Sequence, residues 1–143
     1  MFDISHIHPM TVHFAIALAM TGFLADVVSF IFKNEQNFFK KAGYYLQILA
    51  MIAVVVAFCT GFFLTNEMEG EAGELQEKHE LFAKITLITI IISTILRILF
   101  VYLNKDETKY KYIYLGLLFL AVLGVSYTGF LGGALVYNFM IGL

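Results

Sequence analysis

Residues 42–64, AGYYLQILAMIAVVVAFCTGFFL, contain no charged side chain. The run is longer than the ~20 apolar residues that a helix needs to cross the hydrocarbon core of a bilayer. Three more apolar runs lie at about 10–32, 79–103 and 112–137. With 60% hydrophobic and only 14% charged residues, the chain is too apolar for a water-soluble domain. We therefore expect residues 1–143 to form one all-α domain, a transmembrane four-helix bundle in contact with the lipid bilayer.

The lysines in the predicted loops indicate how the bundle is oriented. The loops after the first and third spans carry Lys33, Lys40, Lys41, Lys105, Lys109 and Lys111. The loop after the second span is instead acidic, with Glu67, Glu69, Glu71, Glu74, Glu77 and Glu80 against Lys78. Short loops rich in Lys and Arg stay on the cytoplasmic side. This predicts a multi-pass protein of the bacterial inner membrane, with both termini and the acidic loop on the periplasmic side.

The first and third spans share one spacing between a histidine and a charged residue. His8 precedes Asp26, and His79 precedes Arg97, by the same 18 positions. Eighteen residues are five helical turns, a rise of ~27 Å that returns to the same helix face. We therefore predict that Asp26 and Arg97 pair near the cytoplasmic end, while the two histidines meet near the outer end. The alternative is that both charges reach the cytoplasmic surface separately. Beyond this spacing, the residue identities show no strong internal repeat.

Ionisable side chains at membrane depth are costly and commonly functional. Two inward imidazoles from diagonally placed helices can bind one haem iron axially. His79 is expected to be the first axial ligand, and His8 or His13 the second. On an ideal helix His13 lies ~140° from His8, away from the face with small residues. The glycines expected to make room for the haem ring are Gly61, Gly129 and Gly133.

Two alternatives to haem stay open. A Zn or Cu ion is compatible with imidazole ligands, here His79, His13, His8 and His6, although no H-E-x-x-H or C-x-x-C spacing supports such a site. The histidines could also be interfacial and bind nothing. The sequence contains no phosphate-binding glycine loop, no nucleophile beside a base and no basic face for nucleic acid. An electron-transfer or binding subunit is therefore favoured over a stand-alone enzyme, with homo-oligomerisation left open.

The stretches HPMTVHF at 8–14 and GFLGGALVY at 129–137 resemble a known family, as do Asp26, the pair Thr60 and Gly61, and His79. The family comprises small four-span bacterial membrane proteins catalogued as a domain of unknown function, number 2231. The resemblance covers nearly the whole chain, and it implies that His8, His13 and His79 belong to the family pattern. Ala15 stands where that pattern has proline.

Members of this family are sometimes fused to Rieske or c-type cytochrome modules, which implies redox work on the outer face of the membrane. We therefore predict a membrane protein that binds haem b and carries single electrons near the periplasmic face. Its partner would be a periplasmic redox protein or a larger membrane complex, and not nucleic acid. The alternative is a periplasmic-face protein that binds divalent Zn or Cu, or a non-catalytic subunit of a larger complex.

Overall fold

The computed structural model describes residues 7–32, 36–65, 67–106 and 109–139. These residues form four helices, α1 (Ile7–Ile31), α2 (Gln36–Leu64), α3 (Gly70–Tyr102) and α4 (Lys111–Phe139). Each helix is long and apolar enough to cross a membrane. The prediction of an all-helical fold with four candidate spans is confirmed.

Two boundaries differ clearly from the prediction. The helix α2 begins at Gln36 and not near 42, and α3 begins at Gly70 and not near 79. Gly70 has a φ of 66°, a backbone conformation that glycine adopts without steric cost. Glu71 lies in the first turn, where a carboxylate interacts favourably with the helix dipole. Most of the acidic segment is therefore helical rather than a loop, and it extends α3 beyond its most apolar part.

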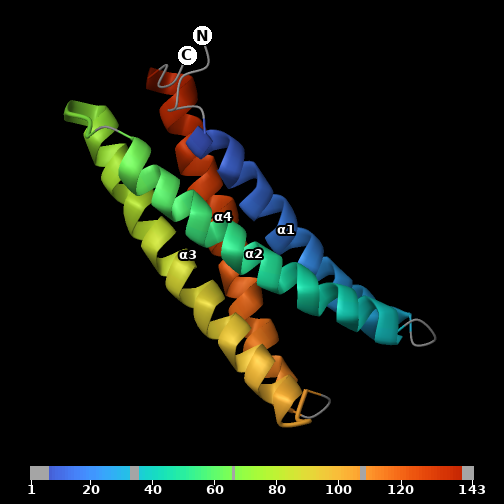
Figure 1. Ribbon diagram of the computed structural model, residues 1–143. Coiled ribbons are helices and arrows are strands. Elements are labelled where there is room, and N and C mark those ends of the chain that lie inside the picture. The colour runs from blue at the N-terminus through green and yellow to red at the C-terminus, as the bar shows by residue number, and fades with distance from the viewer. Residues whose placement is uncertain (1–6, 33–35, 66, 107–108, 140–143) are drawn as a thin grey trace.

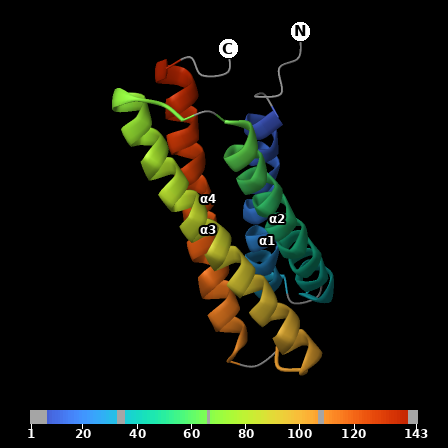
Figure 2. The same ribbon diagram turned by 60° about the vertical axis from the view of Figure 1, so that its left-hand side comes forward.

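The four helices pack as two hairpins, α1 with α2 and α3 with α4 (Figures 1 and 2). Between the hairpins α1 contacts α4, and α2 contacts α3, so α1 and α3 are diagonally opposite. The starts of α1 and α3 and the ends of α2 and α4 lie at one end of the bundle (Figure 1). We call this the histidine end and the opposite one the lysine end. That the histidine end is periplasmic stays a prediction from the lysine distribution.

The two hairpins repeat one another with an offset of 71 residues. Asp26 and Arg97 are separated by 71 positions, and so are His8 and His79. The same offset links most of the positions that fill the centre of the bundle: Ala15 with Thr86, Ala19 with Ile90, Ala50 with Ala121, Val54 with Val125, and Ala57 with Thr128. Since the side-chain types differ at many of these positions, the repeat is evident in the structure and not in the residue identities.

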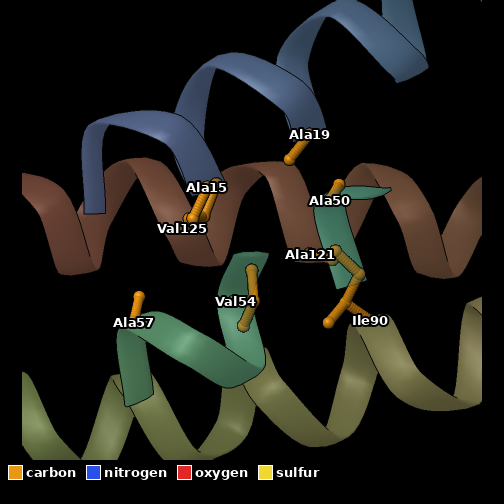
Figure 3. Packing of buried hydrophobic residues seen from close by; sticks show 8 residues of the cluster. All are labelled: Ala15, Ala19, Ala50, Val54, Ala57, Ile90, Ala121 and Val125. Carbon is orange, nitrogen blue, oxygen red and sulfur yellow. The ribbon is translucent and has the colours of Figure 1, made fainter. Parts of the chain in front are cut away.

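The centre of the bundle is lined mainly by small side chains. Figure 3 shows the eight residues of this cluster between the four helices: Ala15, Ala19, Ala50, Val54, Ala57, Ile90, Ala121 and Val125. Large apolar side chains lie outside instead, and Phe62, Phe63 and Phe130 are each 69–74% exposed. Small residues allow helices to approach closely in lipid, where burial of large side chains between helices has no aqueous driving force. The apolar outer surface is suited to contact with acyl chains.

A buried ion pair joins the two hairpins toward the lysine end. Arg97 donates to both carboxylate oxygens of Asp26, over 2.7 and 2.6 Å, and both side chains are 4% exposed. Arg97 also donates to Gln47 Oε1 over 2.7 Å, and Gln47 Nε2 donates to Ser93 Oγ over 2.9 Å. The predicted pairing of Asp26 with Arg97 is confirmed, and separate exposure of the two charges at the surface is wrong.

Candidate functional site

His8 and His79 face each other between diagonal helices at the histidine end. Their ring centroids are 6.2 Å apart, and the ring planes are nearly perpendicular at 88°. Each imidazole is half-buried. Helical periodicity had predicted that both residues lie on inward faces and meet at this end, and the structure agrees. Because Asp26 and Arg97 are anchored together on the same two helices, the rotation of α1 relative to α3 is fixed and keeps the imidazoles opposed.

Each imidazole is oriented by a backbone carbonyl of the neighbouring helix in its own hairpin. His8 Nδ1 lies 3.1 Å from Ala57 O, and His79 Nδ1 lies 3.0 Å from Thr128 O. Both contacts span 49 residues, as the repeat requires. A carbonyl oxygen can only accept, so both contacts favour a proton on Nδ1, which leaves Nε2 with a lone pair. Histidines that bind metals are commonly oriented in this way by the nitrogen that is not a ligand.

Two glycines allow the imidazoles to approach the neighbouring helices. A Cβ at Gly61 would lie 2.8 Å from His8 Cε1, and a Cβ at Gly132 would lie 3.2 Å from His79 Cε1. The two glycines are 71 residues apart and occupy equivalent places in the repeat. Their role is to let a ring lie against the helix backbone, because any side chain at Gly61 would displace His8.

The structure places the other two predicted glycines elsewhere. A Cβ at Gly129 would meet Ile16 Cδ1 at 2.6 Å, and a Cβ at Gly133 would have no atom within 4 Å. Gly133 lines an open hollow on the outer face of α4, beside Phe130 and Tyr137. Of the predicted glycines, therefore, only Gly61 contacts a histidine of the pair.

Of the other predicted ligands, His13 is described by the structure and does not join the pair. His13 is exposed, and its Nδ1 lies 2.6 Å from Pro9 O in the preceding turn. Its exposure agrees with the angular offset from His8 expected on an ideal helix. His6 lies outside the described residues. Within the described ranges no group of three or more His, Cys, Asp or Glu side chains is placed to hold a metal ion.

Several residues of this site were not predicted as site residues. Gly132 leaves room for the His79 ring because it has no side chain. The backbone carbonyls of Ala57 and Thr128 contact Nδ1 of His8 and of His79, respectively. Thr60 places a hydroxyl 3.2 Å from His8 Nδ1. Two signals in the sequence bear on these residues: the offset of 71 positions links Gly61 to Gly132 and Ala57 to Thr128, and Thr60 is among the residues that resemble the family.

Four apolar helices with an apolar exterior and a small-residue interior define a multi-span helical membrane protein. Residues 5–143 match the model of the family described as predicted membrane protein (DUF2231), and the chain belongs to this family. No match was found among curated proteins or among solved structures. The family description gives no activity, and the histidine pair is the feature of the structure that bears on function.

Proposed function

We propose that this membrane protein binds haem b between His8 and His79 and carries single electrons. The observation that carries the proposal is the opposition of two imidazoles whose Nδ1 atoms are both occupied by carbonyl contacts. Each Nε2 is thereby left as the available ligand atom. Two such imidazoles, one from each repeat, match the requirement of a haem iron for two axial ligands.

The dimensions of the pair support this choice. A metal–imidazole bond is about 2 Å long, so one metal held by Nε2 of both His8 and His79 would need the two ring centres about 6 Å apart. The centroid distance is 6.2 Å. A bare ion with only these two ligands would lack the donors that zinc normally takes from protein. Haem supplies four ring nitrogens itself, so the two histidines complete its coordination.

When bound, the haem iron would supply one-electron redox chemistry. The contribution of the chain is to orient the imidazoles through Ala57 O and Thr128 O and to hold α1 against α3 through Asp26 and Arg97. The axial ligands and the burial of the site would set the redox potential.

We further propose that electrons are exchanged on the periplasmic side of the inner membrane. The exposed carboxylates of the acidic segment lie on α3 and just before it, near the histidine end: Glu67, Glu69, Glu71, Glu74, Glu77 and Glu80. A basic redox partner would be attracted to this surface, and its association would slow as salt concentration rises.

The test is the visible spectrum of the protein purified without a histidine tag, in oxidised and dithionite-reduced states. We expect a Soret band and sharp reduced α and β bands of a low-spin haem with two nitrogen ligands. His8→Ala and His79→Ala should each abolish this spectrum, whereas His13→Ala should keep it. Protein without Soret absorption after haem supplementation would contradict the proposal, and stoichiometric zinc or copper in that protein would favour the bare-metal alternative.

A further inference from the structure

The two ends of the bundle carry opposite charge. The stretches 32–41 and 103–111, which cover the two links between helices at the lysine end, contain six lysines and three carboxylates. Residues 65–84, which include the link between α2 and α3 at the histidine end, contain six glutamates and two lysines. The lysine end is thus electropositive. Lysines clustered beside a membrane span attract anionic lipid headgroups.

Three of these lysines lie in or beside the loop between α3 and α4, at the tip of the second hairpin (Figure 1). Lys105 Nζ and Lys109 Nζ are 5.5 and 6.0 Å from the ring centroid of Tyr110. Lys111 Nζ is 4.8 Å from the ring centroid of Phe30 in α1. An aromatic ring attracts a cation within about 6 Å of its centroid. We call Lys105, Lys109 and Lys111 the loop lysines, and the rings hold their charges close to the bundle.

The rings also set the depth of these charges in the membrane. Tyr102, Tyr110 and Tyr112 are exposed at the lysine end of the second hairpin. Lys111 Nζ lies 5.2 Å from the Tyr112 ring centroid as well as over Phe30. Tyrosines at the ends of membrane spans lie at the level of the lipid headgroups. The ammonium groups over these rings therefore lie at the depth of the lipid phosphates.

The first hairpin lacks this arrangement at the equivalent place. Lys109 and Tyr110 correspond to Phe38 and Phe39, 71 positions earlier. Those two rings pack edge to face against each other, with centroids 5.3 Å apart. Because the first hairpin closes without such a cluster, the cluster in the second hairpin is not a requirement of the fold.

Apolar side chains continue from the loop lysines along the outside of the second hairpin. Ile98 and Leu99 on α3 and Ile113 on α4 are exposed, and such a surface suits contact with acyl chains. A free phosphate ion would use only the ammonium groups. A phospholipid would use both the ammonium groups and the apolar surface beside them.

We infer that the loop lysines bind the phosphate group of an anionic phospholipid at the lysine end. The phosphate of a zwitterionic lipid is neutralised by the cation of its own headgroup, so the loop lysines should select for net negative charge. Tyr110 is a positioning residue, since its ring holds two of the three ammonium groups. The inference does not rest on the proposed haem function.

The test is native mass spectrometry of the full-length protein in mild detergent, titrated with phosphatidylglycerol or with phosphatidylcholine of the same acyl chains. We expect the parent protein to bind phosphatidylglycerol more tightly. Lys109→Gln and Lys111→Gln should each lower the ratio of the two affinities about fivefold, the change expected for one charge near an anionic surface. Equal affinity of the parent protein for the two lipids would overturn the inference.

Two matched controls remove the same charge elsewhere. Lys84→Gln acts on a side chain 3.5 Å from Glu80 toward the histidine end, and should leave the ratio unchanged. Lys41→Gln acts on an exposed lysine of the first hairpin, and should change the ratio little. A loss in Lys41→Gln as large as that in Lys109→Gln would overturn the assignment to this loop, because selection would then follow net charge alone.

Two further arms test the geometry and the source of the phosphate. Tyr110→Leu keeps every charge, and should lower the ratio about two- to fivefold because the cation–π contacts are lost. An unchanged ratio, with helix content as in the parent protein, would contradict the positioning role of the ring. Inorganic phosphate should displace phosphatidylglycerol no better than chloride at equal ionic strength. Specific displacement by inorganic phosphate would assign the loop lysines to a free anion and overturn the lipid assignment.

Discussion

The carboxylate of Asp26 and the guanidinium of Arg97 are joined by two hydrogen bonds of 2.7 and 2.6 Å in the interior of the bundle. The two residues occupy equivalent positions of the repeat, and their ion pair joins α1 of the first hairpin to α3 of the second. The Arg97 guanidinium also lies 5.0 Å from the Tyr114 ring centroid and 5.8 Å from that of Tyr44. The charge is thus compensated on several sides, and removal of either partner would leave the other without its counter-ion.

The first prediction concerns this ion pair. Asp26→Asn and Arg97→Gln should each lower the free energy of unfolding by roughly 3–5 kcal/mol, because each leaves an uncompensated buried charge. The double variant Asp26→Leu with Arg97→Met should be much closer to the parent protein, since no charge stays buried. Thermal unfolding in detergent, followed by circular dichroism, checks this. Additive losses in the double variant would contradict the prediction.

Gly43 supplies a second prediction, because it makes room for the same carboxylate. A Cβ at Gly43 would lie 2.8 Å from Asp26 Cγ. Gly43→Ala should therefore displace the carboxylate and destabilise the protein by about 1–3 kcal/mol, as overpacking does. Gly116→Ala is the control, since a Cβ there would have no atom within 4 Å. We expect the thermal unfolding midpoint to fall for Gly43→Ala. For Gly116→Ala it should stay the same or rise, because alanine improves helix propensity by up to about 1 kcal/mol.

The glycines at the histidine end should rank in a fixed order. Gly61→Ala should be the most harmful to haem content, because its Cβ would be 2.8 Å from His8 Cε1. Gly132→Ala should be milder, since the corresponding distance to His79 Cε1 is 3.2 Å. Gly133→Ala should be neutral, because a Cβ there meets no atom within 4 Å. Haem-to-protein ratios from Soret absorbance measure the order, and a loss in Gly133→Ala equal to that in Gly61→Ala would refute it.

Thr86 gives a prediction of opposite sign. Its Oγ1 is buried without a hydrogen-bond partner in the described part of the chain, which is unfavourable in an apolar interior. Thr86→Val should stabilise the protein by about 1 kcal/mol. The control Thr94→Val should destabilise it by about 1 kcal/mol, because Thr94 Oγ1 donates to Ile90 O over 2.7 Å. Unfolding midpoints of both variants check the contrast, and a destabilised Thr86→Val protein would show that its hydroxyl has a favourable role.

The sequence predicted the parts of the fold that depend on helical periodicity. Asp26 and Arg97 follow His8 and His79 by whole turns, so the charge pair and the histidine pair could both be predicted from spacing alone. The start of α3 could not, because six carboxylates before the apolar run are typical of a solvated loop. Residues such as Glu, Ala and Gln are also good helix formers, and this preference prevails from Gly70 onward.

The site itself was predicted only in part, for a geometric reason. Successive residues on a helix point 100° apart, so Gly129, Gly132 and Gly133 point in different directions. The sequence alone does not say which of them lies against the His79 ring. The glycine-rich sequence of α4 does not make that choice, whereas the equivalence with Gly61 does. The carbonyls of Ala57 and Thr128 leave no signal in side-chain type, because any residue could supply them. The hydroxyl of Thr60 was visible, but its proximity to His8 requires the packed hairpin.

The opposite charges at equivalent points of the two hairpins also restrict how the hairpins can associate. Two copies of the α1 and α2 hairpin, arranged as α1–α2 and α3–α4 are here, would bring two carboxylates together in a dry interior. Two copies of the α3 and α4 hairpin would bring two guanidiniums together. Only one hairpin of each kind gives an electrically neutral centre, so like-charge repulsion disfavours self-pairing of either half in the membrane. Because both hairpins belong to one chain, each hairpin with Asp26 is always present together with one hairpin with Arg97.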